Sequence, residues 1–303
     1  MVDLSSDLGF IKLKNPVITA SGTFGYAEEF QDFFNLDILG AFVLKGIYKD
    51  PKPGNSPPRI HETASGLLNS IGLPGPGAKE LQKIVKKIHK LTKTPIIINV
   101  CGDTDEEYIE VAEIFDKMDE VTMLELNISC PNIKMGGKCP AQDEKHTYKL
   151  VNQIKHITSK PLIVKLSPNV NDISSIAISA EEGGADCISL VNTFLGMAVD
   201  LDSKKPVFKN LFAGLSGPAI KPLALKLIWE VVQSVHIPVI GIGGIFSGKD
   251  VLEFILTGAS AVQIGTINIV EPSASVRIIK EIEDIMIKSN IKSLDEIKGK
   301  LKI

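Results

Sequence analysis

Eight short apolar runs, rich in β-branched residues, recur along the chain and alternate with longer segments of helical periodicity. The runs cover residues 16–21, 40–46, 95–100, 122–128, 161–167, 187–192, 237–242 and 260–266. Each run is almost continuously apolar, which is typical of a strand buried on both faces of a parallel sheet. Helical periodicity is clearest at residues 78–91, 105–118 and 219–235, and a last helix is expected after residue 271.

Eight successive strand-then-helix units predict an α/β fold, a single (β/α)8 TIM barrel with a parallel eight-stranded core. The alternative is an open doubly wound sheet, which would need fewer strands and a switch point. A length of 303 residues suits a barrel that folds as one unit. No segment has the composition of a linker, so we expect one domain over residues 1–303.

Charge and composition exclude several classes of protein. The formal net charge of −3 gives no reason to expect nucleic acid or an anionic membrane as a partner. The N-terminus lacks the pattern of a signal peptide, and no apolar run reaches the 18 residues of a membrane span. The cysteines at positions 101, 130, 139 and 187 show no zinc spacing, and the histidines form no cluster. We therefore predict a cytoplasmic protein without a metal site.

Polar or small residues stand at the C-terminal end of every predicted strand, where active sites of this fold lie. They are Ser21, Lys45, Asn99, Asn127, Lys165, Asn192 with Thr193, Gly243 with Gly244, and Gly265 with Thr266. Loops after the last two strands commonly bind phosphate, although glycines there also serve as simple turns. Lysines at buried strand ends suit an anion or a ring that becomes anionic, or else extend to solvent at the rim. The asparagines, with Asn69 and Asn132, offer donors and acceptors that suit a heteroaromatic ring.

Cys130 follows the fourth predicted strand within the segment NISCPNIKMGGKCP, residues 127–140. A thiolate in this place would serve as a nucleophile or a base if its pKa is lowered. The alternative is a buried and inert cysteine, which is how we interpret Cys101 and Cys187. The Gly-rich stretch after Cys130 is predicted to form a flap around residues 135–138.

Across essentially its whole length the sequence resembles the dihydroorotate dehydrogenases. The matching segments include NPVITASGTFG, LKGI, PPRIHETASGLLNSIGLPGPG, ELNISCPN, VKLSPNV, SLVNTFLGMAVD, GLSGPAIKP, IPVIGIGGI and AVQIGT. Cysteine rather than serine in NISCPN is similar to class 1 of the family. The segment VNTFLGMAVD and the Met-Gly-Gly stretch look more like class 1B than the fumarate-using class 1A.

This resemblance implies a flavoprotein of de novo pyrimidine (UMP) biosynthesis that oxidises (S)-dihydroorotate to orotate. Cys130 would remove the C5 proton while the C6 hydride passes to FMN. The FMN contacts implied are Ser21, Lys45, Gly46, Asn99, Asn127, Lys165, Val191, Gly217, Gly243, Gly244, Gly265 and Thr266. The substrate contacts implied are Lys45, Asn69, Ser70, Ile71, Gly72, Leu73, Asn127, Asn192 and Thr193.

The resemblance to class 1B also implies a partner. Electrons would pass to NAD⁺ through a separate subunit that carries FAD and a [2Fe–2S] cluster, in a heterotetramer built on a homodimer of this chain. The four cysteines are too scattered to ligate a cluster themselves.

Four rival functions remain open at this level. They are a class 1A enzyme that uses fumarate, a dihydropyrimidine-type dehydrogenase, an aldolase-like barrel with a Schiff base on Lys165 or Lys45, and a non-catalytic binding subunit. The presence of Cys130 and of both lysines argues against the last.

Overall fold

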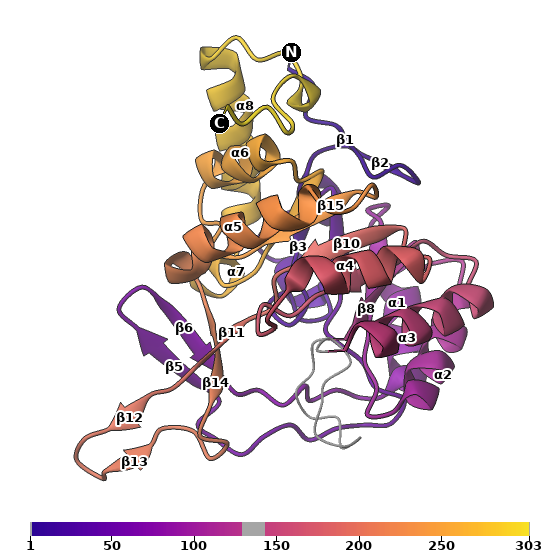
Figure 1. The fold of residues 1–303 in the computed structure, drawn as a ribbon, viewed down its shortest axis with the longest axis vertical. Helices are drawn as coiled ribbons and strands as arrows, with labels where there is room; N and C mark the ends of the chain where they lie inside the picture. Colours follow the sequence, from indigo (N-terminus) through magenta and orange to yellow (C-terminus); the bar gives the residue numbers. More distant parts are fainter. Residues whose placement is uncertain (1, 129–142, 303) are drawn as a thin grey trace.

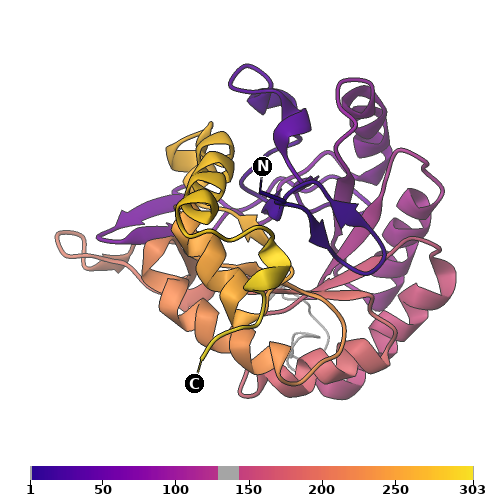
Figure 2. The ribbon, with the colours of Figure 1, turned by 90° about the horizontal axis from the view of Figure 1, so that it is seen from above.

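The fold is a closed barrel of eight parallel strands (Figure 2), described by a computed structural model for residues 2–128 and 143–302. Around the barrel the strands follow the order β10-β15-β16-β3-β4-β7-β8-β9. They are β3 (Val17–Thr19), β4 (Ala41–Val43), β7 (Ile96–Val100), β8 (Met123–Asn127), β9 (Leu162–Lys165), β10 (Cys187–Leu190), β15 (Val239–Ile242) and β16 (Ala261–Ile264). Each lies within one of the eight predicted runs, so the predicted (β/α)8 barrel is confirmed.

Helices form a ring outside the strands (Figures 1 and 2). They are α1 (Ala78–His89), α2 (Asp105–Asp116), α3 (Glu144–Ile157), α4 (Ile173–Glu182), α5 (Lys221–Val232), α6 (Gly248–Thr257), α7 (Ile267–Val270) and α8 (Ala274–Lys288). Several begin at a side chain that accepts a hydrogen bond from the first turn, such as Thr104 before α2 and Asp172 before α4. In α1 the apolar positions Leu81, Val85 and Ile88 recur at helical spacing and are buried against the barrel.

The first crossover, between β3 and β4, contains two 3₁₀ turns and no α-helix. The turns are η1 (Glu28–Phe30) and η2 (Leu36–Ile38). Aromatic side chains cover the barrel here, with the rings of Phe24 and Phe30 stacked at a centroid distance of 4.0 Å. Large aromatic rings bury much surface per residue, so a short segment covers this side of the barrel. Two further 3₁₀ turns, η4 (Pro218–Ile220) and η5 (Leu294–Glu296), precede α5 and follow α8.

A hairpin near the N-terminus closes the N-terminal end of the barrel (Figure 2). Its strands are β1 (Ser6–Asp7) and β2 (Lys12–Leu13), paired antiparallel. Leu8 and Leu13 are buried with Ile18, Ile97 and other residues inside the barrel. This apolar plug leaves the C-terminal end as the place for a ligand.

A second, antiparallel sheet extends beyond the barrel (Figure 1) and was not predicted. It is built from two excursions of the chain and has the order β11-β14-β6-β5. Its strands are β5 (Ile60–Thr63), β6 (Gly66–Asn69), β11 (Phe194–Gly196) and β14 (Ala213–Ser216), and the small hairpin of β12 (Val199–Asp200) and β13 (Lys205–Pro206) continues it. Gly66 allows the close approach of β6 and β14, because a Cβ there would lie 2.2 Å from the carbonyl oxygen of Ser216.

The interior of the barrel changes from apolar to polar along its axis. At the N-terminal end the buried residues are aliphatic, with Met123 and Cys187. Nearer the C-terminal ends of the strands the interior contains Asn99, Glu125, Ser189 and Gln263, all fully buried. Polar groups of this kind are costly to bury unless they are paired, so they indicate the functional end of the barrel. No helix in the described ranges has the length and apolarity needed to cross a membrane.

Candidate active site

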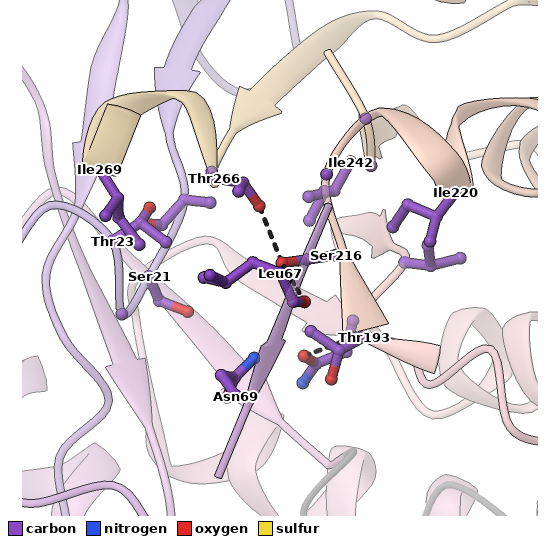
Figure 3. A pocket seen from close by; sticks show the side chains of 18 of the residues that line it. Ser21, Thr23, Leu67, Asn69, Thr193, Ser216, Ile220, Ile242, Thr266 and Ile269 are labelled. Carbon is purple, nitrogen blue, oxygen red and sulfur yellow. Dashed lines mark hydrogen bonds between the residues drawn. The ribbon is translucent and has the colours of Figure 1, made fainter. Parts of the chain in front are cut away.

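A cavity lies at the C-terminal end of the barrel, between the strand ends and the second sheet (Figure 3). Ten residues predicted to contact FMN line it: Ser21, Lys45, Asn127, Lys165, Val191, Gly217, Gly243, Gly244, Gly265 and Thr266. The residues of the predicted substrate set that line it are Lys45, Asn69, Ile71, Leu73, Asn127, Asn192 and Thr193. The structure therefore brings most of the predicted site together in one cavity, on seven barrel strands and the loops that follow them.

Two predicted substrate contacts, Ser70 and Gly72, do not line the cavity. Side chains of an extended segment point alternately to opposite sides, and Asn69, Ile71 and Leu73 take the side of the cavity. On the other side the Oγ of Ser70 accepts a hydrogen bond from Asn55 Nδ2, 3.1 Å away. The direct substrate contacts predicted for Ser70 and Gly72 stay predictions.

Two predicted FMN contacts, Gly46 and Asn99, also lie outside the cavity lining. Asn99 sits one layer deeper in the barrel, where its Nδ2 donates to Glu125 Oε1 at 2.7 Å and its Oδ1 accepts from Asn127 Nδ2 at 3.2 Å. A Cβ at Gly46 would come within 2.7 Å of Asn99 Oδ1 and 2.9 Å of Cys101 Sγ. Asn99 thus supports Asn127, and Gly46 leaves space for Asn99 and Cys101. The direct contact of Asn99 and Gly46 with FMN stays a prediction.

Cys130, predicted as the base, lies outside the described residues, as do Asn132 and the predicted flap at residues 135–138. Asn127, at the end of β8, is the described residue nearest to them in sequence that lines the cavity.

Lys165 reaches the cavity from the end of β9 and is almost completely buried, with only 5% of its side chain exposed. Its ammonium group donates to Ser21 Oγ at 3.2 Å and lies 3.7 Å from Glu125 Oε1. A buried cation is tolerated because this carboxylate stands behind it. The ammonium group is therefore held at the cavity wall as a fixed positive charge.

Lys45 follows β4 and brings a second cation to the cavity. Burial, and then the positive charge of Arg59, hold the pKa of Lys45 below the ordinary lysine range, although Glu29 acts in the opposite direction. Among residues 2–128 and 143–302 no carboxylate forms an ion pair with Lys45. An ammonium group that is partly buried, and has no carboxylate partner among the described residues, suits an anionic ligand.

Glycines after β15 and β16 form one end of the cavity. Gly244 has a φ of +71°, and a Cβ there would lie 2.7 Å from the backbone nitrogen of Lys221. Lys221 is itself fixed by Asp250 Oδ1 at 2.5 Å and Glu253 Oε2 at 2.8 Å. Only glycine permits this backbone to pass so close to α5 while facing the cavity.

Some cavity residues were not predicted from the sequence. They are Ala20, Gly22, Thr23, Ile60, Leu67, Ser216, Ile220, Ile242, Ile245, Phe246 and Ile269. Ser216 accepts a hydrogen bond from Thr266 Oγ1 at 2.8 Å, which joins the end of β16 to the second sheet (Figure 3). Its position directly before Gly217, in the segment GLSGP, is the sequence feature from which Ser216 could have been predicted to line the cavity. Ile60 and Leu67 reach the cavity only because the unpredicted sheet folds over it.

The family model for dihydroorotate dehydrogenase matches residues 3–286. The chain belongs to the dihydroorotate dehydrogenase family. Among its curated relatives, a protein of Geobacter metallireducens is 50% identical over 303 residues, covering 99% of each chain. Relatives from Thermoanaerobacter pseudethanolicus and Bacteroides fragilis are 46% and 45% identical, with 100% of each chain covered. All three are named dihydroorotate dehydrogenase B (NAD(+)), catalytic subunit.

A solved structure has the same fold. The crystal structure of DHODH in complex with ferulenol from Eimeria tenella aligns with a TM-score of 0.83 at 22% identity, covering 98% of this chain and 88% of the other. The predicted family and its class 1B branch are thus confirmed by the sequence relatives, and the barrel by the solved structure.

Proposed function

We propose that this chain is the FMN-binding catalytic subunit of a class 1B dihydroorotate dehydrogenase, which oxidises (S)-dihydroorotate to orotate in pyrimidine biosynthesis. The observation that carries the proposal is the cavity lined by a buried lysine, a half-buried lysine and several glycines, in a chain 45–50% identical over full length to enzymes of that name. We further propose that residues 1–303 act as one domain in the cytoplasm.

The residues of the cavity fit FMN. Gly244 and Gly265 leave room for a phosphate to approach the backbone, and Val191, Ile242 and Ile245 offer apolar surface to a flat ring. Gly265 is informative because a Cβ there would meet nothing closer than Ala20 Cβ at 3.6 Å. The cavity therefore has room for a ligand in front of the backbone of Gly265. When bound, FMN supplies the acceptor for the C6 hydride of dihydroorotate.

The protein's own residues would bind and orient the reactants. Lys165 places a positive charge where negative charge gathers on reduction, and Lys45 pairs with an anionic group such as the substrate carboxylate. Asn69 is held by its Nδ2, which donates to the carbonyl oxygen of Gly214 at 3.1 Å. Asn192 Oδ1 accepts from the backbone N–H of Thr193 at 2.8 Å, and both residues face the cavity. Fixed amides of this kind select one orientation of a pyrimidine ring.

In the proposed reaction Cys130 takes the C5 proton. Electrons then leave for NAD⁺ through a separate subunit with FAD and a [2Fe–2S] cluster, and two such pairs form a heterotetramer around a homodimer of this chain. The name catalytic subunit, carried by the relatives, supports a partner of this kind.

Binding of orotate is expected to weaken at alkaline pH. The anion binds the protonated form of Lys45, and because the pKa of Lys45 is lowered, this form is lost at a lower pH than for an ordinary lysine. Lys45→Met should bind orotate about tenfold or more weakly at neutral pH, since a hydrogen bond between charged groups contributes about 1.5–3 kcal/mol. Calorimetric titration from neutral to alkaline pH measures both effects. Equal affinity of the variant and the wild type at neutral pH would exclude this role of Lys45.

Gly265→Ala is expected to lose FMN but to keep its stability. The new Cβ makes an ordinary contact with Ala20 and projects into the cavity, so the folded protein is not strained while the ligand is displaced. Replacing glycine at an unstrained position changes stability by about 0.4–1 kcal/mol in the favourable direction. We expect at least about tenfold weaker FMN binding, or about 1.4 kcal/mol. Flavin fluorescence titration and thermal unfolding of the flavin-free protein give the two results, and unchanged FMN affinity would contradict the placement.

The proposed function is tested anaerobically on the purified chain. Its flavin spectrum is recorded, dihydroorotate or, in a parallel sample, dihydrouracil is added, and fumarate and NAD⁺ are then offered in turn. Bleaching of the flavin with little reoxidation by either acceptor is expected of a class 1B subunit without its partner. Prompt reoxidation by fumarate would instead indicate class 1A, and bleaching only by dihydrouracil would indicate a dihydropyrimidine dehydrogenase.

A further inference from the structure

A carboxylate is buried inside the barrel directly behind the proposed flavin site. Glu125 is on β8 and has no exposed surface. Its oxygens accept hydrogen bonds from Asn99 Nδ2 at 2.7 Å, Gln263 Nε2 at 2.5 Å and Ser189 Oγ at 3.0 Å. The partners come from β7, β16 and β10, so one side chain gathers groups from opposite sides of the barrel.

The charge of Glu125 has one cationic partner among the described residues. The three hydrogen-bond donors are neutral, and only the ammonium group of Lys165 lies within ion-pair distance, 3.7 Å from Oε1. Lys165 also lines the cavity. The ammonium group therefore stands between a fixed anion behind it and the ligand in front of it, and at close range both act on it strongly.

We infer that Glu125 is a positioning residue that acts through Lys165 and sets the reduction potential of the flavin in the cavity. The inference rests on the proposed function, which places FMN in contact with Lys165. Glu125 holds the ammonium group at the cavity wall and offsets part of its positive charge. Without that negative charge, the site favours the more negatively charged, reduced form of the flavin.

Glu125→Gln tests the inference because it removes the charge and keeps the shape. The network has room for the new amide, since Gln263 Oε1 is buried without a hydrogen-bond partner in the described chain. A flip of the Gln263 amide would present that oxygen to the new NH₂ group. We expect the midpoint potential of bound FMN to become more positive. The expected shift is at least tenfold in the equilibrium between oxidised and reduced flavin, or about 30 mV for a two-electron couple.

Ser189→Ala is the matched control. It removes one neutral hydrogen bond from the same carboxylate and no charge, so the potential should change much less than in Glu125→Gln. The potentials are measured by anaerobic titration of the flavin-loaded protein with dithionite and indicator dyes. Equal shifts in the two variants would show that packing of the network, and not the charge of Glu125, sets the potential.

A double variant shows whether Glu125 acts through Lys165. In Lys165→Met no ammonium group remains for Glu125 to hold at the cavity wall or to offset. Adding Glu125→Gln in that background should then leave the potential unchanged. The same shift in both backgrounds would overturn the inference.

If Glu125→Gln is too unstable to measure, Glu125→Asp moves the carboxylate away from Lys165 by the length of one methylene group. A smaller positive shift of the flavin midpoint potential is then expected. An unchanged potential there would also overturn it.

The outcome is separable from that of the proposed function. Dithionite reduces the flavin without dihydroorotate. If dihydroorotate does not reduce the flavin, but Glu125→Gln still shifts the midpoint potential, only the proposed substrate is overturned. A protein that dihydroorotate bleaches, but whose potential is the same in Glu125→Gln, would overturn only the inference. A wild-type chain that binds no flavin would overturn both.

Discussion

Cys130→Ala is expected to keep bound FMN and to lose most dihydroorotate-dependent flavin reduction. A positioned general base contributes about 10²–10⁴-fold to a proton transfer, and we expect a loss in that range. The C5 proton of dihydroorotate is held by carbon, and its removal needs a base in place. Anaerobic stopped-flow spectroscopy of flavin bleaching measures the rate directly. Photochemical reduction of the same sample shows that the flavin itself remains competent.

Cys187→Ala is the control for the loss of a thiol. Cys187 is on β10, fully buried among the aliphatic residues at the N-terminal end of the barrel. Burial, and then the charge of Glu125, raise the pKa of Cys187 far above the ordinary thiol range, so it remains an inert thiol at neutral pH. This variant should reduce its flavin at the wild-type rate. Full reduction rates in Cys130→Ala as well would exclude Cys130 as the base.

The barrel was predictable because its strands are buried on both faces. Runs such as residues 95–100 are continuously apolar, and the structure places β7 at Ile96–Val100, within one residue at the start. The cavity followed from the same pattern, since the fold brings all strand ends to one rim. Lys45, Lys165 and Asn127 could therefore be assigned to one site without knowledge of any side-chain position.

The second sheet was not predicted, because little in its strands distinguishes them from loops. Every residue of β5 is exposed, and β11 has three residues with none fully buried. Such strands are stabilised by pairing with partners far along the chain, as Leu68 on β6 is with Leu215 on β14. The pattern of one segment does not reveal these partners. Cavity residues that depend on the sheet, such as Ile60 and Leu67, were missed for that reason.

How deep each polar residue lies inside the barrel could also not be predicted from the sequence. Asn99 was expected at the rim of the site because it ends a predicted strand, but the structure places it below the cavity, where it contacts Glu125. Glu125, which lies in the middle of a predicted strand, drew no prediction. A polar residue inside a buried strand needs partners from other strands, and those are known only once the barrel closes.

Lys165→Met is expected to impair both stability and chemistry, for two separable reasons. The change leaves the carboxylate of Glu125 buried without its cation. Breaking a buried ion pair in this way costs about 3–5 kcal/mol. The change also removes the positive charge that faces the proposed flavin. We expect dihydroorotate-dependent reduction to slow by about 10²–10³-fold, as on removal of a group that stabilises developing charge.

The double variant Lys165→Met/Glu125→Gln separates these two effects. Without a buried charge to compensate, the double variant should recover most of the lost free energy of unfolding, because neutral groups in the same space restore the balance. It should not recover the rate, since the ammonium group at the cavity wall is still missing. Urea unfolding and stopped-flow flavin reduction on the same preparations give the two quantities. Recovery of both would mean that Lys165 serves only to neutralise Glu125. Recovery of stability alone would assign the ammonium group to the chemistry in the cavity and the carboxylate to holding it there.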